Sequence, residues 1–287
     1  MNTKNFKKVL ILGSTGKMGI ALKAVLEGAY DVVGKNSKDF DACNFSEVKN
    51  LIKNATPDIV INTVAFMGID ACEKDPPQAL QLNALLPKFL AELSNEAGFL
   101  FIHFSTDAVF SGKDEKVYLE TDCPHPVNLY GYTKFGGDCF IKAIAEKCYI
   151  LRVPILFGRA IKANQFVEKM LDKVEKGQKV LRLSEDLISS PSYSKDIATE
   201  ARRIIENSLP FGLYHIANAG GVSLYDFFKE IAENLRLPVK LERASYLDFP
   251  HLGLKNIHTP MESSSIPSLR PWKEAVKDYC STFGNAV

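Results

Sequence analysis

The sequence of 287 residues contains no C-x-x-C pair, because its six cysteines are scattered over positions 43, 72, 123, 139, 148 and 280. Scattered cysteines in a chain of this size are typical of reduced thiols that fill space in a core, so they exclude a disulfide framework. The five histidines are also dispersed, and none lies at zinc-ligand spacing from a cysteine or another histidine. The sequence therefore predicts a cytoplasmic protein without a bound metal.

Two further absences narrow the class of protein. The net charge is only +1 and no basic stripe or charge block occurs, which argues against a nucleic-acid or membrane-surface partner. No apolar stretch approaches the roughly 20 residues needed to span a bilayer, and residues 1–8 are too polar for a signal peptide. We expect a soluble globular protein, with monomer and homodimer both left open.

Short apolar runs alternate with helical patterns through the first half of the chain. Because the apolar runs are apolar on both faces, they are typical of strands covered by helices on each side. This alternation predicts βαβ units and a doubly wound parallel sheet, an α/β fold of the Rossmann type. The predicted strands are 9–12, 30–34, 58–64, 99–104 and 149–153, and the predicted helices between them are 46–54, 78–97 and 130–147.

The alternation loosens after Gly158. We expect residues 1–158 to form a dinucleotide-binding domain, to which 193–218 return. Residues 159–192 and 219–287 would form a smaller, C-terminal substrate-binding domain, packed at the carboxyl ends of the strands, where open α/β sheets bind ligands.

A glycine-rich segment directly follows the first predicted strand, Val9–Leu12. A strand, a glycine turn and a helix bring bare backbone to a pyrophosphate: the first glycine permits the turn, the second removes a blocking Cβ, and the third lets the helix pack closely. The N–H groups at the helix start then face the negative charge. A purely structural turn remains the alternative. The candidate cofactor-binding residues here are Gly13, Ser14, Thr15, Gly16, Lys17, Met18 and Gly19.

A candidate proton donor lies in the segment from Tyr130 to Lys134. Their spacing of four places both side chains on one helical face. A free phenol ionises near pH 10, and a neighbouring ammonium would lower the pKa of the phenol towards neutrality. Tyr225 and Lys229 have the same spacing, but they open an amphipathic helix whose Phe227 and Phe228 are typical of a core. The first pair is therefore the predicted catalytic one.

The chain resembles an extended short-chain dehydrogenase/reductase, and more narrowly the dTDP-4-dehydrorhamnose reductase family. The S-T-D-x-V-F segment followed by Y-G-x-T-K is far more specific to this family than the glycines are. Matching segments run through most of the chain: 13–19, 57–62, 69–76, 83–84, 105–110, 130–134, 151–152 and 212–215.

The resemblance implies a role for each matching residue. Thr106 and Tyr130 would bind the substrate's keto oxygen, with Tyr130 as proton donor, and Lys134 would hold the nicotinamide ribose and tune the phenol. Gly16, Lys17 and Met18 would line the pyrophosphate, Asp41 and Ala42 the adenine, and Ala65, Phe66 and Met67 the nicotinamide side. The implied substrate-binding residues are Thr106, Asp107, Ile155 and Asn164, although the default role of Asn164 is a helix N-cap.

The chain departs from the family pattern mainly in the sugar half. Ala108 stands where an aromatic residue is usual, and Ile155 replaces a tryptophan. Where the family has a Q-x-G-x-P-T loop, this chain has Leu187 to Ser192 and lacks the glutamine and the glycine. Where the family has an R-P-x-x-S stretch, this chain has Thr259 to Ser263 and lacks the arginine. These departures favour a relative with a different sugar or nucleotide over the dTDP-rhamnose enzyme itself.

The end of the second predicted strand bears on the cofactor. An acidic residue there would bind the adenosine 2′-hydroxyl, but the sequence has Lys35, followed by two small polar residues and Lys38. This favours NADPH, with NADH still usable.

The sequence thus predicts a reductase of a nucleotide-activated 4-keto-6-deoxy sugar that serves polysaccharide synthesis. The alternatives are an epimerase or dehydratase of the same superfamily, and a non-catalytic NADP-binding regulatory subunit.

Overall fold

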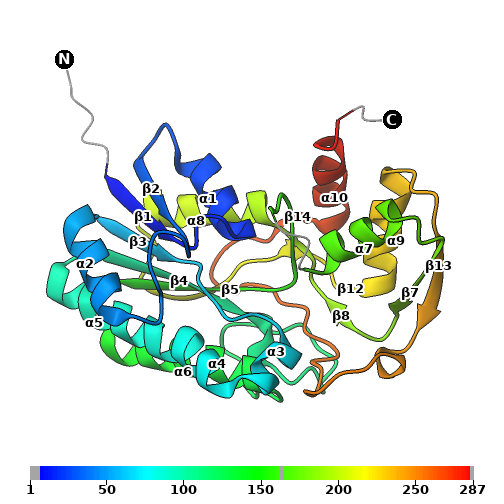
Figure 1. Ribbon diagram of the computed structural model, residues 1–287, viewed down its shortest axis with the longest axis horizontal. Coiled ribbons are helices and arrows are strands. Elements are labelled where there is room, and N and C mark those ends of the chain that lie inside the picture. Colours follow the sequence, from blue (N-terminus) through cyan, green and yellow to red (C-terminus); the bar gives the residue numbers. More distant parts are fainter. Residues whose placement is uncertain (1–6, 162–164, 285–287) are drawn as a thin grey trace.

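The structure is a computed structural model that describes residues 7–161 and 165–284 (Figure 1). Within these residues six parallel strands form the main sheet in the order β10-β5-β4-β3-β1-β2. The predicted α/β doubly wound fold is confirmed, and 212–215 return to the sheet as expected. The strands are β1 (Lys8–Leu12), β2 (Asp31–Lys35), β3 (Ile59–Asn62), β4 (Leu100–Thr106), β5 (Cys148–Val153) and β10 (Gly212–His215).

Helices cover both faces of this sheet, and alternate strand residues supply one core on each face. Val9 and Ile11 of β1 pack with α1 (Lys17–Leu26) and α8 (Ser194–Glu206). Leu10 and Leu12 pack on the opposite face, whose helices are α2 (Phe45–Ala55), α5 (Leu86–Ala97) and α6 (Leu129–Ile144). The sheet therefore holds its polar strand ends rigidly between two apolar layers.

The helix expected over 78–97 is present, but it is not one regular α-helix. A π-helical turn (Gln81–Leu85) separates α4 (Pro76–Leu80) from α5, and α3 (Ile69–Lys74) precedes them. Pro87 has no N–H to donate, so an unbroken α-helical ladder cannot pass through this point. The wider turn places the buried Asn83 so that its amide bonds the backbone of Phe66 and donates to Thr133 Oγ1 (3.1 Å).

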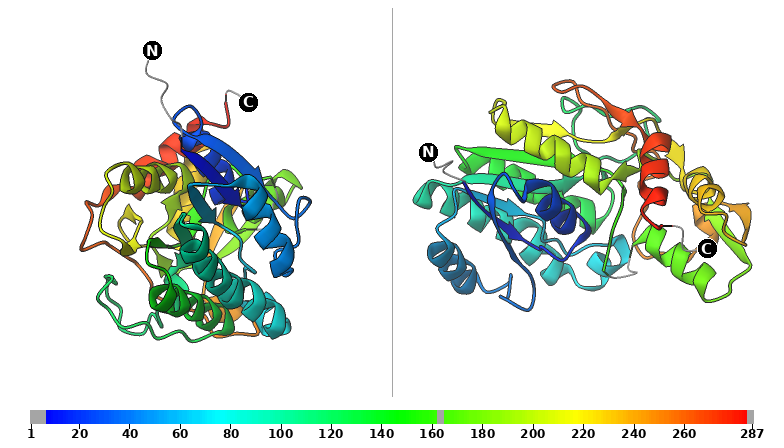
Figure 2. Two further views of the ribbon diagram at one scale, coloured as in Figure 1. Left: turned by 90° about the vertical axis from the view of Figure 1, so that its left-hand side faces the viewer. Right: turned by 90° about the horizontal axis from the view of Figure 1, so that it is seen from above.

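The elements that hold a second apolar core lie beyond the carboxyl ends of the strands (Figures 1 and 2). This core is built around Phe157, Phe227, Phe228, Trp272 and Tyr279. Its main elements are α7 (Phe166–Glu175), β7 (Val180–Ser184), α9 (Leu224–Asn234), β13 (Lys240–Ala244) and α10 (Trp272–Ser281). Short strands accompany them: β6 (Leu156–Phe157), β8 (Ile188–Ser189), β9 (Ser192–Tyr193), β11 (Asn218–Ala219), β12 (Val222–Ser223) and β14 (Leu269–Pro271).

The connection order creates a crevice at the edge of the sheet. The strand β1 lies between β2 and β3, so the strand order reverses at β1, and open α/β sheets bind ligands at such a switch point.

Among residues 7–161 and 165–284, no helix combines the length and apolar character needed to cross a membrane. The same described residues contain no group of three His, Cys, Asp or Glu side chains placed to hold a metal ion.

Candidate active site

A cavity of about 570 Å³ opens at the carboxyl ends of the strands. The sheet and its flanking helices contribute Gly16, Thr106 and Tyr130 to its wall, and the second core contributes Phe166 and Leu224. A ligand in the cavity would therefore touch both parts of the chain.

The glycine turn has the crowded geometry that its spacing predicts. Gly13 has a φ of +87°, and a Cβ at this position would lie 2.6 Å from Thr63 Oγ1. A Cβ on Gly19 would lie 2.3 Å from Gly13 O, so α1 packs against the turn at a distance that only glycine permits. Gly16 begins α1 and lines the cavity. This bare backbone at a helix start fits the diphosphate of a dinucleotide.

The side chain of Lys17 is already engaged within the protein. Its Nζ donates to Leu156 O (2.7 Å) and forms an ion pair with Glu168 (2.9 Å) of α7. Burial lowers the pKa of Lys17, while Glu168 acts in the opposite direction. Lys17 lines the cavity, and its ammonium also ties the glycine turn to the second core.

A polar network occupies the end of β4. Thr106 Oγ1 donates to Asp107 Oδ1 (3.1 Å), and Asp107 Oδ2 accepts from Ser189 (3.2 Å) and Thr259 (2.6 Å). Burial raises the pKa of the Asp107 carboxyl, and these hydroxyls oppose the rise. Both Thr106 and Asp107 line the cavity.

Tyr130 lies in the first turn of α6, opposite the end of β4. Asn128 caps this helix by accepting from Gly131 N (2.9 Å), and Gly131 has no room for a Cβ, which would lie 2.2 Å from Ala108 O. Tyr130 therefore sits close to Thr106 on the cavity wall. Burial raises the pKa of the Tyr130 phenol, although the Thr106 hydroxyl opposes this. Lys134 is not among the groups that shift this pKa, so the expected lowering by Lys134 does not appear.

Lys134 also lines the cavity, but its side chain is almost wholly buried, with 1% exposed. Its Nζ donates to Phe104 O (2.7 Å) and lies 3.1 Å from His103 Nε2. Burial lowers the pKa of Lys134 to about 8, with Asp138 opposing. Burial therefore makes Lys134 a weaker base than an exposed lysine.

The second Y-x-x-x-K copy does not line this cavity. Tyr225 stacks under the Arg243 guanidinium at 4.2 Å, and Lys229 pairs with Glu233. Phe227 and Phe228 are buried in the second core.

The other predicted residues divide into two groups. The cavity wall includes Met18, Ala65, Met67 and Ile155. The other predicted residues in this set do not line the cavity. Phe66 is held through its backbone by Asn83, and Asp41 Oδ1 accepts from Cys43 N (2.9 Å) as a loop cap. Lys35 forms an ion pair with Asp39 (3.7 Å). The predicted residues outside the cavity wall are Gly13, Ser14, Thr15, Gly19, Lys35, Asp41, Ala42 and Phe66; Asn164 lies outside the described residues.

Four further residues of the cavity wall were not among the predicted site residues: Ser189, Lys255, Asn256 and Thr259. Ser189 and Thr259 do lie in two of the segments that depart from the family pattern. No spacing relates them to Asp107, since they lie about 80 to 150 positions away along the sequence. His103 is buried in β4, and its ring contacts Lys134.

Comparison with known proteins yields a consistent group of relatives. The family described as RmlD substrate binding domain matches residues 7–284. The chain is 30% identical to the spore coat polysaccharide biosynthesis protein SpsK of Bacillus subtilis (strain 168), over 95% of this chain and 96% of that protein. It is also 30% identical to the dTDP-4-dehydrorhamnose reductase of Aggregatibacter actinomycetemcomitans, over 94% of this chain and 97% of the other.

Solved structures agree with this grouping. The dTDP-4-dehydrorhamnose reductase from Bacillus anthracis str. Ames, solved in complex with NADP, superposes with a TM-score of 0.90 at 27% identity. The match covers 96% of this chain and 98% of that one.

Proposed function

This chain belongs to the RmlD substrate binding domain family, and on that premise we propose that it is an NADPH-dependent reductase of a nucleotide-activated 4-keto-6-deoxy sugar. The observation that carries the proposal is the convergence of Thr106, Tyr130 and Lys134 on one cavity that begins at the glycine turn. The relatives named dTDP-4-dehydrorhamnose reductase support the reaction class.

The proposed reaction adds a hydride and a proton to the sugar C4 carbonyl. The bound reduced nicotinamide would supply the hydride. Tyr130 would donate its phenolic proton to the carbonyl oxygen, which becomes the C4 hydroxyl, while the Thr106 hydroxyl would hold that oxygen in place. The raised pKa of Tyr130 suits this role, because a reductase needs its donor protonated before the hydride arrives.

The cofactor would lie from the glycine turn towards Tyr130. Gly16, Lys17 and Met18 would line the diphosphate, and Ala65 and Met67 the nicotinamide side, since all five lie on the cavity wall. Lys134 would hold the nicotinamide ribose. We assign NADPH because Lys35 ends β2 where an acidic residue would reject a 2′-phosphate, and because the Bacillus anthracis relative is described with NADP. NADH would be the weaker cofactor.

The second core would act as the sugar-binding domain, made from residues 159–192 and 219–287. Ile155, Leu187 and Ile188 give this side of the cavity an apolar lining, while Asp107 provides a carboxylate braced by Ser189 and Thr259. The apolar lining suits the C6 methyl of a 6-deoxy sugar.

A panel of 4-keto-6-deoxy sugar nucleotides tests the proposal by the oxidation of NADPH and NADH. We expect stoichiometric oxidation with at least one member, and faster turnover with NADPH. An epimerase would instead convert its substrate without net cofactor oxidation. A regulatory subunit would bind NADPH and oxidise none with any sugar, which would refute the proposal.

A further inference from the structure

Four charged side chains lie on the cavity wall among residues 7–161 and 165–284: Lys17, Asp107, Lys134 and Lys255. A nucleotide-activated sugar carries a negatively charged diphosphate and several hydroxyl groups. A lysine ammonium is a hydrogen-bond donor suited to both kinds of oxygen. The three lysines are therefore the cationic groups on this wall that a sugar nucleotide could meet.

Two of these lysines are already engaged within the protein. Lys17 Nζ pairs with Glu168 and donates to Leu156 O. Lys134 Nζ donates to Phe104 O. Both side chains are buried, so their donors are largely used in holding the fold together.

Lys255 keeps unused donors. Its Nζ lies 3.2 Å from Asp70 Oδ1, an oxygen that also accepts from Leu252 N at 3.1 Å. Among the residues that the structure describes, Asp70 is the one side chain that pairs with this ammonium. An ammonium has three N–H donors, and the Lys255 side chain is 24% exposed. Two donors therefore remain for a ligand in the cavity.

The segment that carries Lys255 is held on both sides. A Cβ on Gly253 would lie 2.5 Å from Ile69 Cγ2, so the segment packs closely on α3. On the other side, Asn256 Nδ2 donates to Ala108 O at 3.3 Å. Lys255 is thus fixed between α3 and the end of β4, at the edge of the cavity where Thr106 lies.

We propose that Lys255 is a substrate-binding residue in the reductase proposed above, on which this inference rests. Its ammonium donates to an oxygen of the bound sugar nucleotide, either a hydroxyl of the sugar or an oxygen of the diphosphate. Because Asn256 contacts the backbone two residues after Thr106, the lysine lies on the side of the cavity where the keto oxygen would be held.

The apolar part of the wall increases the importance of this contact. Ile155, Leu187 and Ile188 offer no side-chain donor to a ligand. A polar oxygen that leaves water for such a cavity costs free energy unless a hydrogen bond replaces the lost water. A contact with Lys255 would offset this cost and fix the sugar relative to Thr106.

Isothermal titration calorimetry of the full-length protein, saturated with NADP⁺, tests the inference with a panel of 4-keto-6-deoxy sugar nucleotides. NADP⁺ has no hydride to give, so the keto sugar binds without reacting. Lys255→Gln should weaken binding of the sugar nucleotide about 10- to 100-fold, as expected for the loss of a hydrogen bond to a charged group. NADP⁺ affinity should be unchanged, and Lys255→Arg should recover most of the sugar affinity.

Unchanged sugar affinity in Lys255→Gln would overturn the inference. An equal loss of NADP⁺ affinity would overturn it as well, because the lysine would then serve the cofactor.

Two further variants separate a substrate contact from structural support. Asp70→Asn removes the ion pair with Lys255 but keeps an oxygen for Leu252 N, so sugar affinity should fall by less than about fivefold, the size of an exposed ion pair. Lys116→Gln removes a lysine that also pairs with an aspartate, Asp122, but does not line the cavity. It should leave sugar affinity unchanged. Equal losses in Asp70→Asn and Lys255→Gln would show that the lysine only ties its segment to α3.

The matching free nucleoside diphosphate distinguishes the two oxygens. If Lys255 contacts the diphosphate, Lys255→Gln weakens binding of this probe too; if it contacts a sugar hydroxyl, only the intact sugar nucleotide is affected. Sugar binding that depends on Lys255 without any oxidation of NADPH would refute the proposed function alone. Turnover and binding that are both indifferent to Lys255 would refute this contact alone.

Discussion

The carboxyl end of β4 brings three chemically different side chains together within five residues. His103 faces Lys134, Thr106 faces the cavity, and Asp107 accepts from hydroxyls of the second core. Residues this close in sequence can have such different partners because alternate residues of a strand point to opposite faces.

The S-T-D segment after the apolar strand predicted that Thr106 lies at the site. The partners of Asp107 could not be predicted, because they come from loops that only the folded chain brings near.

Tyr130→Phe tests the proton donor. The variant keeps the ring but loses the hydroxyl, so turnover should fall at least 10²-fold, the usual size of a general-acid contribution. NADPH affinity should change little. Steady-state kinetics and a fluorescence titration measure the two effects.

Tyr225→Phe is the matched control, since Tyr225 has the same Y-x-x-x-K spacing but stacks on Arg243. It should keep wild-type turnover. Wild-type turnover in Tyr130→Phe would show that another group donates the proton.

Lys134 should leave a signature in the pH dependence of stability. Its folded pKa of about 8 is below the usual 10.5, so between these pH values the unfolded chain binds a proton that the folded protein lacks. The free energy of unfolding should therefore gain from this residue as the pH rises through that window. The gain is absent below about pH 8, where both states carry the proton.

Urea unfolding of wild type and Lys134→Met at several pH values measures this contribution as a difference. The difference should grow in favour of the wild type from about pH 8 upwards. A difference that stays constant with pH would show that the lysine has its ordinary pKa.

At the scale of elements, the sequence predicted the sheet well because its strands are apolar on both faces and its helices are amphipathic. It missed the π-helical turn (Gln81–Leu85) inside the helix expected over 78–97. Helical periodicity alone does not register a proline that interrupts the hydrogen-bond ladder. The failure matters for the site, because the π-helical turn places Asn83 against α6.

Two neighbouring glycines of α6 test this contact. A Cβ on Gly137 would lie 2.4 Å from Asn83 O, whereas the nearest atom to a Cβ on Gly136 is Ala84 Cβ at 3.6 Å. Gly137→Ala should therefore lower the free energy of unfolding by about 1–3 kcal/mol through overpacking. Gly136→Ala should raise it by up to about 1 kcal/mol, because alanine favours a helix.

Chemical denaturation of the two variants gives the comparison. Equal stabilities would mean that α6 does not approach the π-helical turn as closely as described.

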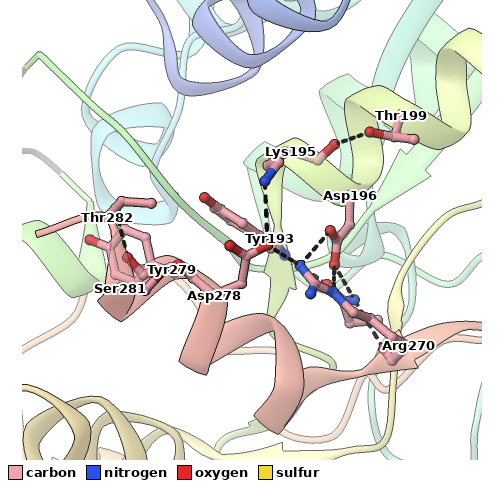
Figure 3. A network of polar contacts seen from close by, with 10 residues as sticks. Tyr193, Lys195, Asp196, Thr199, Arg270, Asp278, Tyr279, Ser281 and Thr282 are labelled. Atoms are coloured by element: carbon pink, nitrogen blue, oxygen red, sulfur yellow. Dashed lines mark hydrogen bonds and ion pairs between the residues drawn. The ribbon is translucent and has the colours of Figure 1, made fainter. Parts of the chain in front are cut away.

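At the scale of the whole molecule, polar contacts join the sheet to the second core. Arg270 of β14 binds Asp196 of α8 through two hydrogen bonds (both 2.8 Å) and Asp278 of α10 at 2.7 Å (Figure 3). Lys17 and Glu168 make a similar tie beside the cavity. None of these pairs could be predicted, because complementary charges far apart in sequence carry no periodic signal.

Arg270→Met should weaken the junction. Removing the guanidinium leaves two partly buried carboxylates without this partner, which should cost about 1–3 kcal/mol of unfolding free energy.

This contribution should depend on pH. Arg270 lowers the pKa of Asp278, so the stabilisation is present above the usual carboxyl pKa and is lost as the pH falls through the folded value. Denaturation near pH 7 and near pH 3 measures it, with Arg243→Met, an exposed pair, as control. A loss that does not shrink in acid would contradict the assignment.

Transfer of a labelled hydride tests the central claim most directly. The protein is incubated with a 4-keto-6-deoxy sugar nucleotide and NADPH that carries deuterium at the transferred position, and the product is analysed by mass spectrometry. We predict one deuterium at C4 for each NADPH oxidised, and a rate that collapses in Tyr130→Phe. A panel of such sugars that yields no labelled product, although NADPH binds, would contradict the claim that this cavity reduces a sugar carbonyl.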